Sequence, residues 1–192
     1  MTSTETTGTE TAGTDQATGT DQATGTTQVH RVYIKATPER IWQAITDPEW
    51  NGRYGYSAPA EYELRAGGTY RSFATEEMKQ ASAAMGWDLP EVIVDGEVVE
   101  VDPPRRLVQT WRMLMDPTAA AEGFSRLTWE IEGPGQDGVC RLTVTHELAG
   151  MPSLYAMTSG NNEFGAMGGG GWPWILSDLK SLLETGEAFP KQ

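Results

Sequence analysis

The sequence predicts an α+β domain, in which a curved antiparallel sheet of about seven strands surrounds a long C-terminal helix, with two short helices after the first strand. Three observations support this prediction. Short β-rich segments separated by Pro and Gly turns follow one another through the middle of the chain. A helix start, Thr37-Pro38-Glu39, comes directly after the first of them. The clearest helical pattern in the chain opens at Pro173, and Gly186 is placed to end it.

The remaining elements follow from the same kinds of signal. The first strand is expected at 28–35, the two short helices at 37–45 and 47–53, and a hairpin at 61–66 and 69–75 around a Gly-Gly turn. Residues 76–85 read as helical, and 76–90 together as an insertion at the rim of the sheet. Further strands are expected at 92–101, 106–116, 123–132 and 139–147, with loops between them that include 117–122.

Two helical segments are expected after the sheet. The first, at 151–167, is a helix or helical loop that two glycines weaken. The second is the long C-terminal helix, whose apolar residues recur at helical spacing. Its stripe is formed by Trp172, Leu176, Leu179 and Leu183, with Ile175 and Leu182 beside it.

The first 27 residues form a separate Thr/Gly-rich tail. They hold no large apolar residue after the initial methionine, and the hexapeptide Gly-Thr-Asp-Gln-Ala-Thr occurs twice in succession between Gly13 and Thr24. Such a segment cannot bury enough apolar surface to offset the entropy of ordering it, so we expect it to be disordered. The folded domain is predicted to span residues 28–192.

The charge balance restricts the classes of partner. The net charge is −13, and the tail contributes four acidic residues and no basic one, which leaves −9 for the rest. Binding to nucleic acid or to an anionic membrane draws on clustered Lys and Arg, so neither partner is predicted. The tail lacks the pattern of a secretion signal, and no segment approaches the roughly 18 apolar residues that span a bilayer. We expect a cytoplasmic protein that is a monomer or a weak dimer.

Motifs for catalysis or metal binding are absent from the sequence. Cys140 is the single cysteine, which excludes an intramolecular disulfide and favours a buried free thiol. His30 and His146 are the two histidines, and Glu147 faces the opposite side of a strand from His146, which argues against a His–Glu relay. We expect His146 to be a partly buried polar group. No catalytic residue, metal or cofactor is predicted.

Aromatic and methionine side chains are numerous, and several fall near turns and loops. The chain has seven Trp, six Tyr and eight Met. Aromatic rings offer large contact areas and methionine adapts to irregular shapes, so we predict a pocket for a hydrophobic small molecule. For each of these residues, ordinary core packing is the alternative interpretation. The predicted lining residues are Trp50, Tyr54, Tyr56, Trp111, Met113, Met115, Trp129, Tyr155, Phe164 and Trp172.

Four segments of the chain carry a family resemblance: residues 36–48, 65–70, 95–112 and 171–186. The first reads Ala-Thr-Pro-Glu-Arg-Ile-Trp-Gln-Ala-Ile-Thr-Asp-Pro, and the last opens with Gly-Trp-Pro-Trp. They resemble the START-like (SRPBCC, Bet v 1-like) superfamily of helix-grip domains, and in particular its Hsp90-ATPase-activator-like group. The resemblance covers about residues 28–186. It is specific for the fold but indicates little about activity, because most of these motifs form turns and packing contacts.

The resemblance implies several functions. Members of the superfamily bind lipids, polyketides or steroids, and some are cyclases or co-chaperones. One small subgroup confers self-resistance to enediyne antibiotics, such as calicheamicin, in actinobacteria. Those proteins offer their own backbone to the drug's diradical and are cleaved. The Thr/Gly-rich tail and the Gly-Trp-Pro helix start of this chain are similar to that subgroup.

A sacrificial mechanism needs a glycine backbone held against the bound drug. A carbon diradical takes hydrogen from a close and weak C–H bond, and glycine Cα–H is activated because the flanking amide nitrogen and carbonyl share the resulting radical. Gly123, after the 117–122 loop, is the first candidate. The glycine-rich run 165–171 before the last helix, with Gly165 and Gly168, is the second. The alternative interpretation is that Gly123 is a turn residue and the run a hinge.

These observations favour a binding protein for a hydrophobic natural product over an enzyme with a conventional acid and base. An enediyne self-resistance protein is its most specific form. The second hypothesis is a polyketide aromatase or cyclase. The third is a co-chaperone that acts on an Hsp90-type ATPase through an exposed face. In the cyclase, the substrate would be positioned and polarised by Tyr54, Tyr155, Arg112 or His146.

Overall fold

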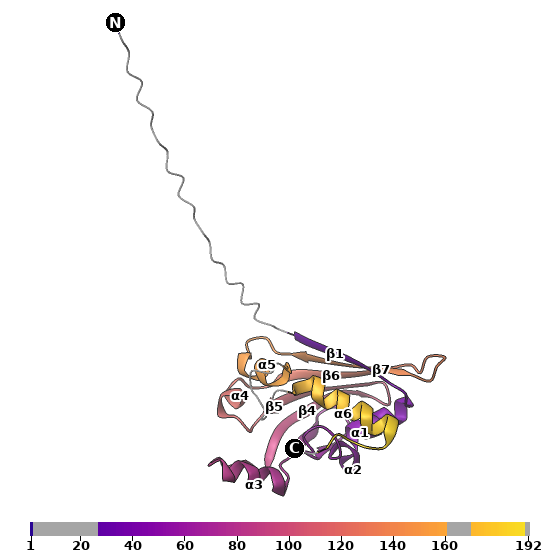
Figure 1. The fold of residues 1–192 in the computed structure, drawn as a ribbon, viewed down its shortest axis with the longest axis horizontal. Coiled ribbons are helices and arrows are strands. Elements are labelled where there is room, and N and C mark those ends of the chain that lie inside the picture. Colours follow the sequence, from indigo (N-terminus) through magenta and orange to yellow (C-terminus); the bar gives the residue numbers. More distant parts are fainter. Residues whose placement is uncertain (2–26, 161–169, 191–192) are drawn as a thin grey trace.

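Seven strands and six helices follow one another in the part of the chain that the computed structural model describes, which is Met1, 27–160 and 170–190 (Figure 1). The strands are β1 (Thr27–Ile34), β2 (Ala60–Tyr62), β3 (Gly68–Phe73), β4 (Val92–Asp102), β5 (Arg106–Met113), β6 (Ser125–Glu132) and β7 (Cys140–Glu147). The helices are α1 (Pro38–Thr46), α2 (Pro48–Asn51), α3 (Glu76–Ala84), α4 (Pro117–Ala121), α5 (Pro152–Thr158) and α6 (Gly171–Thr185). Most of the predicted tail lies outside the described residues.

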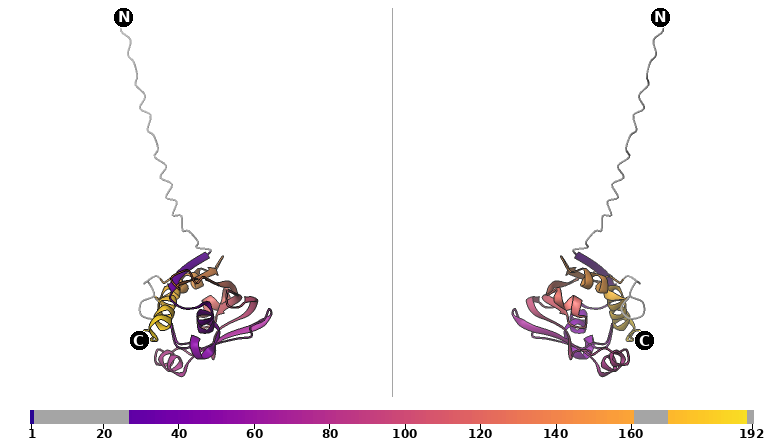
Figure 2. Two further views of the ribbon diagram at one scale, coloured as in Figure 1. Left: turned by 90° about the vertical axis from the view of Figure 1, so that its right-hand side faces the viewer. Right: turned by 90° about the vertical axis from the view of Figure 1, so that its left-hand side faces the viewer.

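The strands form one antiparallel sheet in the order β1-β7-β6-β5-β4-β3-β2. The sheet curves, and the C-terminal helix α6 lies on its concave side together with α1 and α2 (Figures 1 and 2). Helix α6 packs on β1, and α1 contacts both β6 and α6. The predicted α+β helix-grip architecture is therefore confirmed, including the seven strands and the two short helices after the first strand.

Irregular pairing on both sides of β4 allows the sheet to curve. The register shifts between Ser72 and Phe73 in the β3–β4 pair, and between Val98 and Glu100 in the β4–β5 pair. A side chain at Gly96 would place its Cβ 1.9 Å from a backbone carbonyl oxygen of β5, so only glycine fits there. Such bulges increase the local twist of a strand pair, and here they shape the inner wall of the domain.

The short helices begin where the sequence predicts. The Thr37 hydroxyl accepts a hydrogen bond from the Arg40 N–H (3.3 Å) at the start of α1. The Asp47 carboxylate accepts from the Glu49 N–H (2.9 Å) at the start of α2. A proline follows each of these capping residues, at a position where its missing N–H costs nothing.

The connection between β5 and β6 differs from the prediction. It was expected to be a loop at 117–122 but contains helix α4, because the Asp116 carboxylate accepts from the Ala119 N–H (2.8 Å) and Pro117 occupies the first helical position. The flanking strands are shortened accordingly. Strand β5 ends at Met113 and β6 begins at Ser125.

The C-terminal helix also differs slightly from the prediction. It begins at Gly171, two residues before Pro173. A proline is tolerated in this first turn because the first N–H groups of a helix have no intrahelical acceptor. Its buried stripe contains Leu182, whereas Leu183, predicted for the stripe, is only partly buried. Helix α5 covers the first part of the predicted 151–167 segment, and residues 161–167 lie outside the described residues.

Candidate ligand-binding cavity

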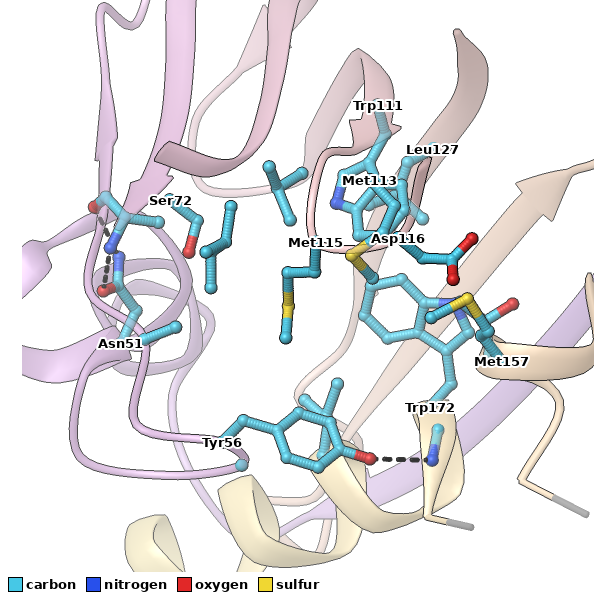
Figure 3. A pocket seen from close by; sticks show the side chains of 18 of the residues that line it. Asn51, Tyr56, Ser72, Trp111, Met113, Met115, Asp116, Leu127, Met157 and Trp172 are labelled. Carbon is cyan, nitrogen blue, oxygen red and sulfur yellow. Dashed lines mark hydrogen bonds between the residues drawn. The ribbon is translucent and has the colours of Figure 1, made fainter. Parts of the chain in front are cut away.

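A cavity of about 770 Å³ lies between the concave face of the sheet and the helices that cover it (Figure 3). Its wall is formed by strands β2 to β6, the segment between α2 and β2, helix α3 with the loop after it, and parts of α1, α2, α4, α5 and α6. Apolar, aromatic and methionine side chains predominate. Among the described lining residues, Asp116 is the one carboxylate, and none is Lys, Arg or His. A cavity of this size accommodates a multi-ring organic molecule.

Seven of the ten lining residues predicted from the sequence lie on this cavity: Tyr54, Tyr56, Trp111, Met113, Met115, Trp129 and Trp172. Trp111 and Met113 share the inner face of β5, as period-two alternation requires. Met115 lies beyond the end of the strand but still points into the cavity (Figure 3).

The other three predicted residues are not placed there. Trp50 is stacked with two guanidinium groups, those of Arg40 and Arg53, at 3.6 and 4.3 Å from the ring centroid. Tyr155 packs against the core from α5 without reaching the cavity, and its backbone carbonyl accepts from the Gln28 side chain (2.8 Å). Phe164 lies outside the described residues.

Two groups of lining residues were missed. Tyr62, Tyr70 and Ser72 occupy inward-facing positions of the β2–β3 hairpin, and their alternation in the sequence was a usable signal. Met78 and Trp87 come from the segment predicted only as a rim insertion. Trp87 lines the cavity while 60% exposed, so this segment forms part of the cavity mouth.

His146 lies behind the cavity wall and is fully buried, not partly buried as expected. Desolvation, with a smaller effect of His30, lowers its pKa to about 3, so the ring is neutral. Its Nδ1 accepts from the Trp172 indole N–H (3.1 Å), which places the ring proton on Nε2. Nε2–H donates to Ser125 Oγ (2.7 Å), whose hydroxyl donates to the Trp111 carbonyl (2.8 Å). His146 therefore holds two wall residues in place.

Three further hydrogen bonds hold the rim of the cavity. Asp178 on α6 is 1% exposed, and its carboxylate accepts from the N–H of Gly55 (2.7 Å) and from that of Phe189. The Tyr56 hydroxyl accepts from the Gly171 N–H (3.1 Å), as Figure 3 shows. The segment between α2 and β2, the start of α6 and the C-terminal residues are thus held together.

The candidate glycines fall in different places. Gly123 (φ +88°) does not line the cavity, and its N–H donates to the Ala120 carbonyl (3.2 Å), as expected of a turn residue that ends α4. Gly165 and Gly168 lie outside the described residues. Gly171, the last residue of the candidate glycine-rich run 165–171, lines the cavity, and so does Gly55, which was not predicted.

The residues considered for polarising a substrate are engaged elsewhere. Arg112 forms two hydrogen bonds with the Asp95 carboxylate (2.9 and 2.7 Å) and does not line the cavity. The Tyr54 hydroxyl donates to the Ala44 carbonyl (3.2 Å), and burial raises its pKa. Cys140 is buried as predicted, and burial raises the pKa of its thiol.

Two further findings concern the described residues as a whole. Within them, no three His, Cys, Asp or Glu side chains are grouped so as to hold a metal ion. None of the helices in residues 27–160 and 170–190 combines the length and the apolar content required to cross a membrane.

Comparison with known proteins identifies the family. Residues 35–184 match the sequence profile of the activator of Hsp90 ATPase homolog 1-like proteins. The chain belongs to this family. The match covers every element from α1 to the penultimate residue of α6, including the cavity wall. None of the curated proteins is significantly similar to this Hsp90-activator-like chain.

Solved structures share its fold at low sequence identity. The protein encoded by BPP1335 from Bordetella parapertussis is 24% identical, with a TM-score of 0.59 over 86% of this chain and 78% of that one. The solution structure of CalU16 from Micromonospora echinospora is 18% identical (TM-score 0.53, 86% and 69% covered). DynU16, a protein in the dynemicin biosynthetic locus, is 19% identical (TM-score 0.55, 85% and 49%). In a crystal structure of CalU16, this chain covers 59% of the CalU16 chain. The chain therefore spans only part of the length of CalU16 and of DynU16.

Proposed function

We propose that this Hsp90-activator-like protein binds a hydrophobic natural product in its central cavity. The observation that carries the proposal is the cavity of about 770 Å³ with its mainly apolar lining. A multi-ring ligand gains free energy there from burial of its apolar surface and from stacking on Trp111, Trp129 and Trp172. The described lining residues supply a single carboxylate, Asp116, and no basic group to work with it as an acid–base pair.

The most specific form of this proposal is self-resistance to an enediyne antibiotic. Dynemicin is an enediyne, and DynU16, in its biosynthetic locus, shares the fold of this chain. A cavity whose described lining residues include no acid–base pair suits a protein whose contribution is to hold the drug against its own backbone. A protein in that role would bind the drug and react with it once, at the cost of its own chain.

We propose Gly55 and Gly171 as the glycines that would react, because of their position in the cavity. Gly55 and Gly171 line the cavity, whereas Gly123 does not. At Gly171 the position of a side chain is filled by the Thr158 carbonyl oxygen, 2.4 Å from an ideal Cβ, so the other Cα–H is the one free to face a ligand. Each radical carbon of the drug would take one hydrogen atom and leave a radical at Cα. Dioxygen would then add to that radical to give a peroxyl radical, and the thiol that activates the drug would reduce it to an α-hydroxyglycine and water while it is itself oxidised to a disulfide. The Cα–N bond of the α-hydroxyglycine would then break, leaving an amide on one fragment and a glyoxylyl group on the other.

The experiment is incubation with one equivalent of reductively activated calicheamicin, followed by mass spectrometry of the intact chain and a DNA-nicking assay. We expect loss of the intact chain, fragments that end at Gly55 or Gly171, and protected DNA. Protein labelled with α-deuterated glycine should transfer deuterium to the aromatised drug. Gly123→Ala is the matched control and should protect equally. An intact chain together with nicked DNA would contradict the sacrificial role.

The family assignment favours one second candidate, a co-chaperone, since the family is named for activation of the Hsp90 ATPase. This function would use an exposed face rather than the cavity. The ATPase rate of a bacterial Hsp90, measured with and without an excess of this protein, separates the two. Our proposal predicts an unchanged rate, and a severalfold increase would favour the co-chaperone.

A further inference from the structure

Three hydroxyl-bearing side chains lie together on the inner face of β2 and β3. Tyr62 and Tyr70 are paired across the two strands, with ring centroids 4.7 Å apart, and Ser72 follows Tyr70 on the same face. All three line the cavity, and Figure 3 shows Ser72 on the opposite side of it from Trp172. We call Tyr62, Tyr70 and Ser72 the hydroxyl face.

The polar groups of this region are only partly satisfied by one another. Ser72 is 5% exposed and lines the cavity. Its oxygen is directed toward the cavity in Figure 3. Gln109 is fully buried on β5, and its side-chain amide lies close enough to the Tyr62 and Tyr70 hydroxyls to affect their pKa values, without forming a well-aligned hydrogen bond to any described residue. Buried polar groups in proteins are normally paired, so this end of the cavity offers unused hydrogen-bonding capacity.

The hydroxyl face is uncharged. Burial raises the pKa of Tyr70 to about 12, and polar interactions with the side chains of Trp111, Tyr62 and Gln109 act in the opposite direction. Burial also raises the pKa of Tyr62 well above its ordinary value. Both phenols therefore stay protonated at neutral pH, and each can donate one hydrogen bond and accept another. Because no Lys, Arg or His is among the described lining residues, a buried carboxylate would find no counter-charge here.

We propose that the hydroxyl face binds one uncharged oxygen function of the ligand: a ketone, quinone, phenol or alcohol. The tryptophan and methionine side chains of the wall hold the ligand's rings. Gln109 does not line the cavity and acts as a positioning residue behind the tyrosines. The inference rests on the proposed function, since it requires a small molecule in the cavity. It narrows the ligand to a neutral oxygenated polycycle and excludes fatty acids and plain hydrocarbons as preferred ligands.

Three fluorescent probes with one ring system test this inference: pyrene, 1-hydroxypyrene and 1-pyrenecarboxylate, titrated at pH 7. We expect 1-hydroxypyrene to bind about tenfold more tightly than either of the other two, the gain expected from a buried neutral hydrogen bond. Tyr70→Phe, Tyr62→Phe and Ser72→Ala should each reduce the ratio of 1-hydroxypyrene affinity to pyrene affinity severalfold. Tyr33→Phe is the control: it removes the hydroxyl of an exposed tyrosine on β1 that does not line the cavity, and it should preserve the preference.

The outcomes separate the inference from the function on which it rests. Equal affinities for the three probes, or a preference that survives all three substitutions, would overturn the hydroxyl face and leave the binding function standing. Tighter binding of the carboxylate would overturn it as well. If no probe bound to the folded wild-type protein, the proposed binding function itself would fail. Near-UV circular dichroism of each variant checks that the core remains packed.

Discussion

The indole N–H of Trp172 donates to Nδ1 of His146 over 3.1 Å, and this bond joins the start of α6 to the inner face of β7. Because indole nitrogen is only a donor, His146 must be unprotonated at Nδ1. The same Trp172 ring lies edge-to-face against Trp129, with centroids 5.4 Å apart. His146, which the sequence predicts to be a partly buried polar group, is therefore a buried acceptor that fixes an aromatic residue of the cavity wall.

The first prediction concerns the titration of His146. Its folded-state pKa of about 3 lies below the ordinary value of 6.5, so between these values the unfolded chain binds a proton that the folded chain does not. The contribution of His146 to stability is thus complete above pH 6.5 and falls as the pH drops toward 3. At pH 5 the loss is about 2 kcal/mol. Imidazole nitrogen NMR should show His146 with its proton on Nε2 and no titration between pH 8 and 5.

Assignment of that spectrum is simple, because His30 is the other histidine of the chain. His30→Gln removes its signals and leaves those of His146. A midpoint near pH 6.5 in this variant would show that His146 is not desolvated as the structure has it.

The second prediction concerns the donor of the same hydrogen bond. Trp172→Phe leaves Nδ1 of His146 buried without a partner, so the free energy of unfolding should fall by about 1–3 kcal/mol. Pyrene affinity should fall as well, because Trp172 lines the cavity. Trp174→Phe is the matched control. Trp174 makes an edge contact with Phe189, which phenylalanine can keep, and we expect a loss below about 1 kcal/mol by urea denaturation.

Local signals explain how much of the fold could be predicted. The N-terminal ends of α1 and α2 depend on a capping oxygen, from Thr37 and Asp47, and on the proline that follows it. Both features can be recognised from two adjacent residues of the sequence. The pairing of successive strands from β2 to β7 follows from the connections between them, whereas the pairing of β1 with β7 is a long-range contact. Helix α4 was missed because five residues carry too little periodicity to be recognised, and its existence depends on the Asp116 cap.

The cavity was only partly predictable, for a different physical reason. Alternation along β5 was enough to place Trp111 and Met113 on one wall. No local pattern shows that Trp50 is stacked between two arginine side chains, or that Tyr155 on a seven-residue helix stays outside the cavity. The contribution of Trp87 depends on how the inserted segment packs over the mouth, which is a tertiary contact.

The third prediction concerns the buried carboxylate of Asp178. Asp178→Asn replaces a charged acceptor of the Gly55 and Phe189 N–H groups by a neutral amide, and the free energy of unfolding should fall by about 1.5–3 kcal/mol. Because Gly55 and the adjacent Tyr56 line the cavity, pyrene should also bind more weakly. The same change at exposed Asp88 is the control and should alter neither quantity. Unchanged stability in Asp178→Asn would mean that these two bonds do not hold the rim.

The fourth prediction compares two glycines that both have positive φ. Gly186 (φ +86°) has no atom within 4 Å of an ideal Cβ, so Gly186→Ala should cost only the backbone strain, about 1 kcal/mol. Gly171 (φ +44°) has the Thr158 carbonyl oxygen 2.4 Å from that position, and its own N–H is bonded to Tyr56. Gly171→Ala adds a backbone clash to the strain and should cost about 2–4 kcal/mol in total. Thermal unfolding of the two variants measures the difference, and equal losses would show that the start of α6 is not packed against the end of α5.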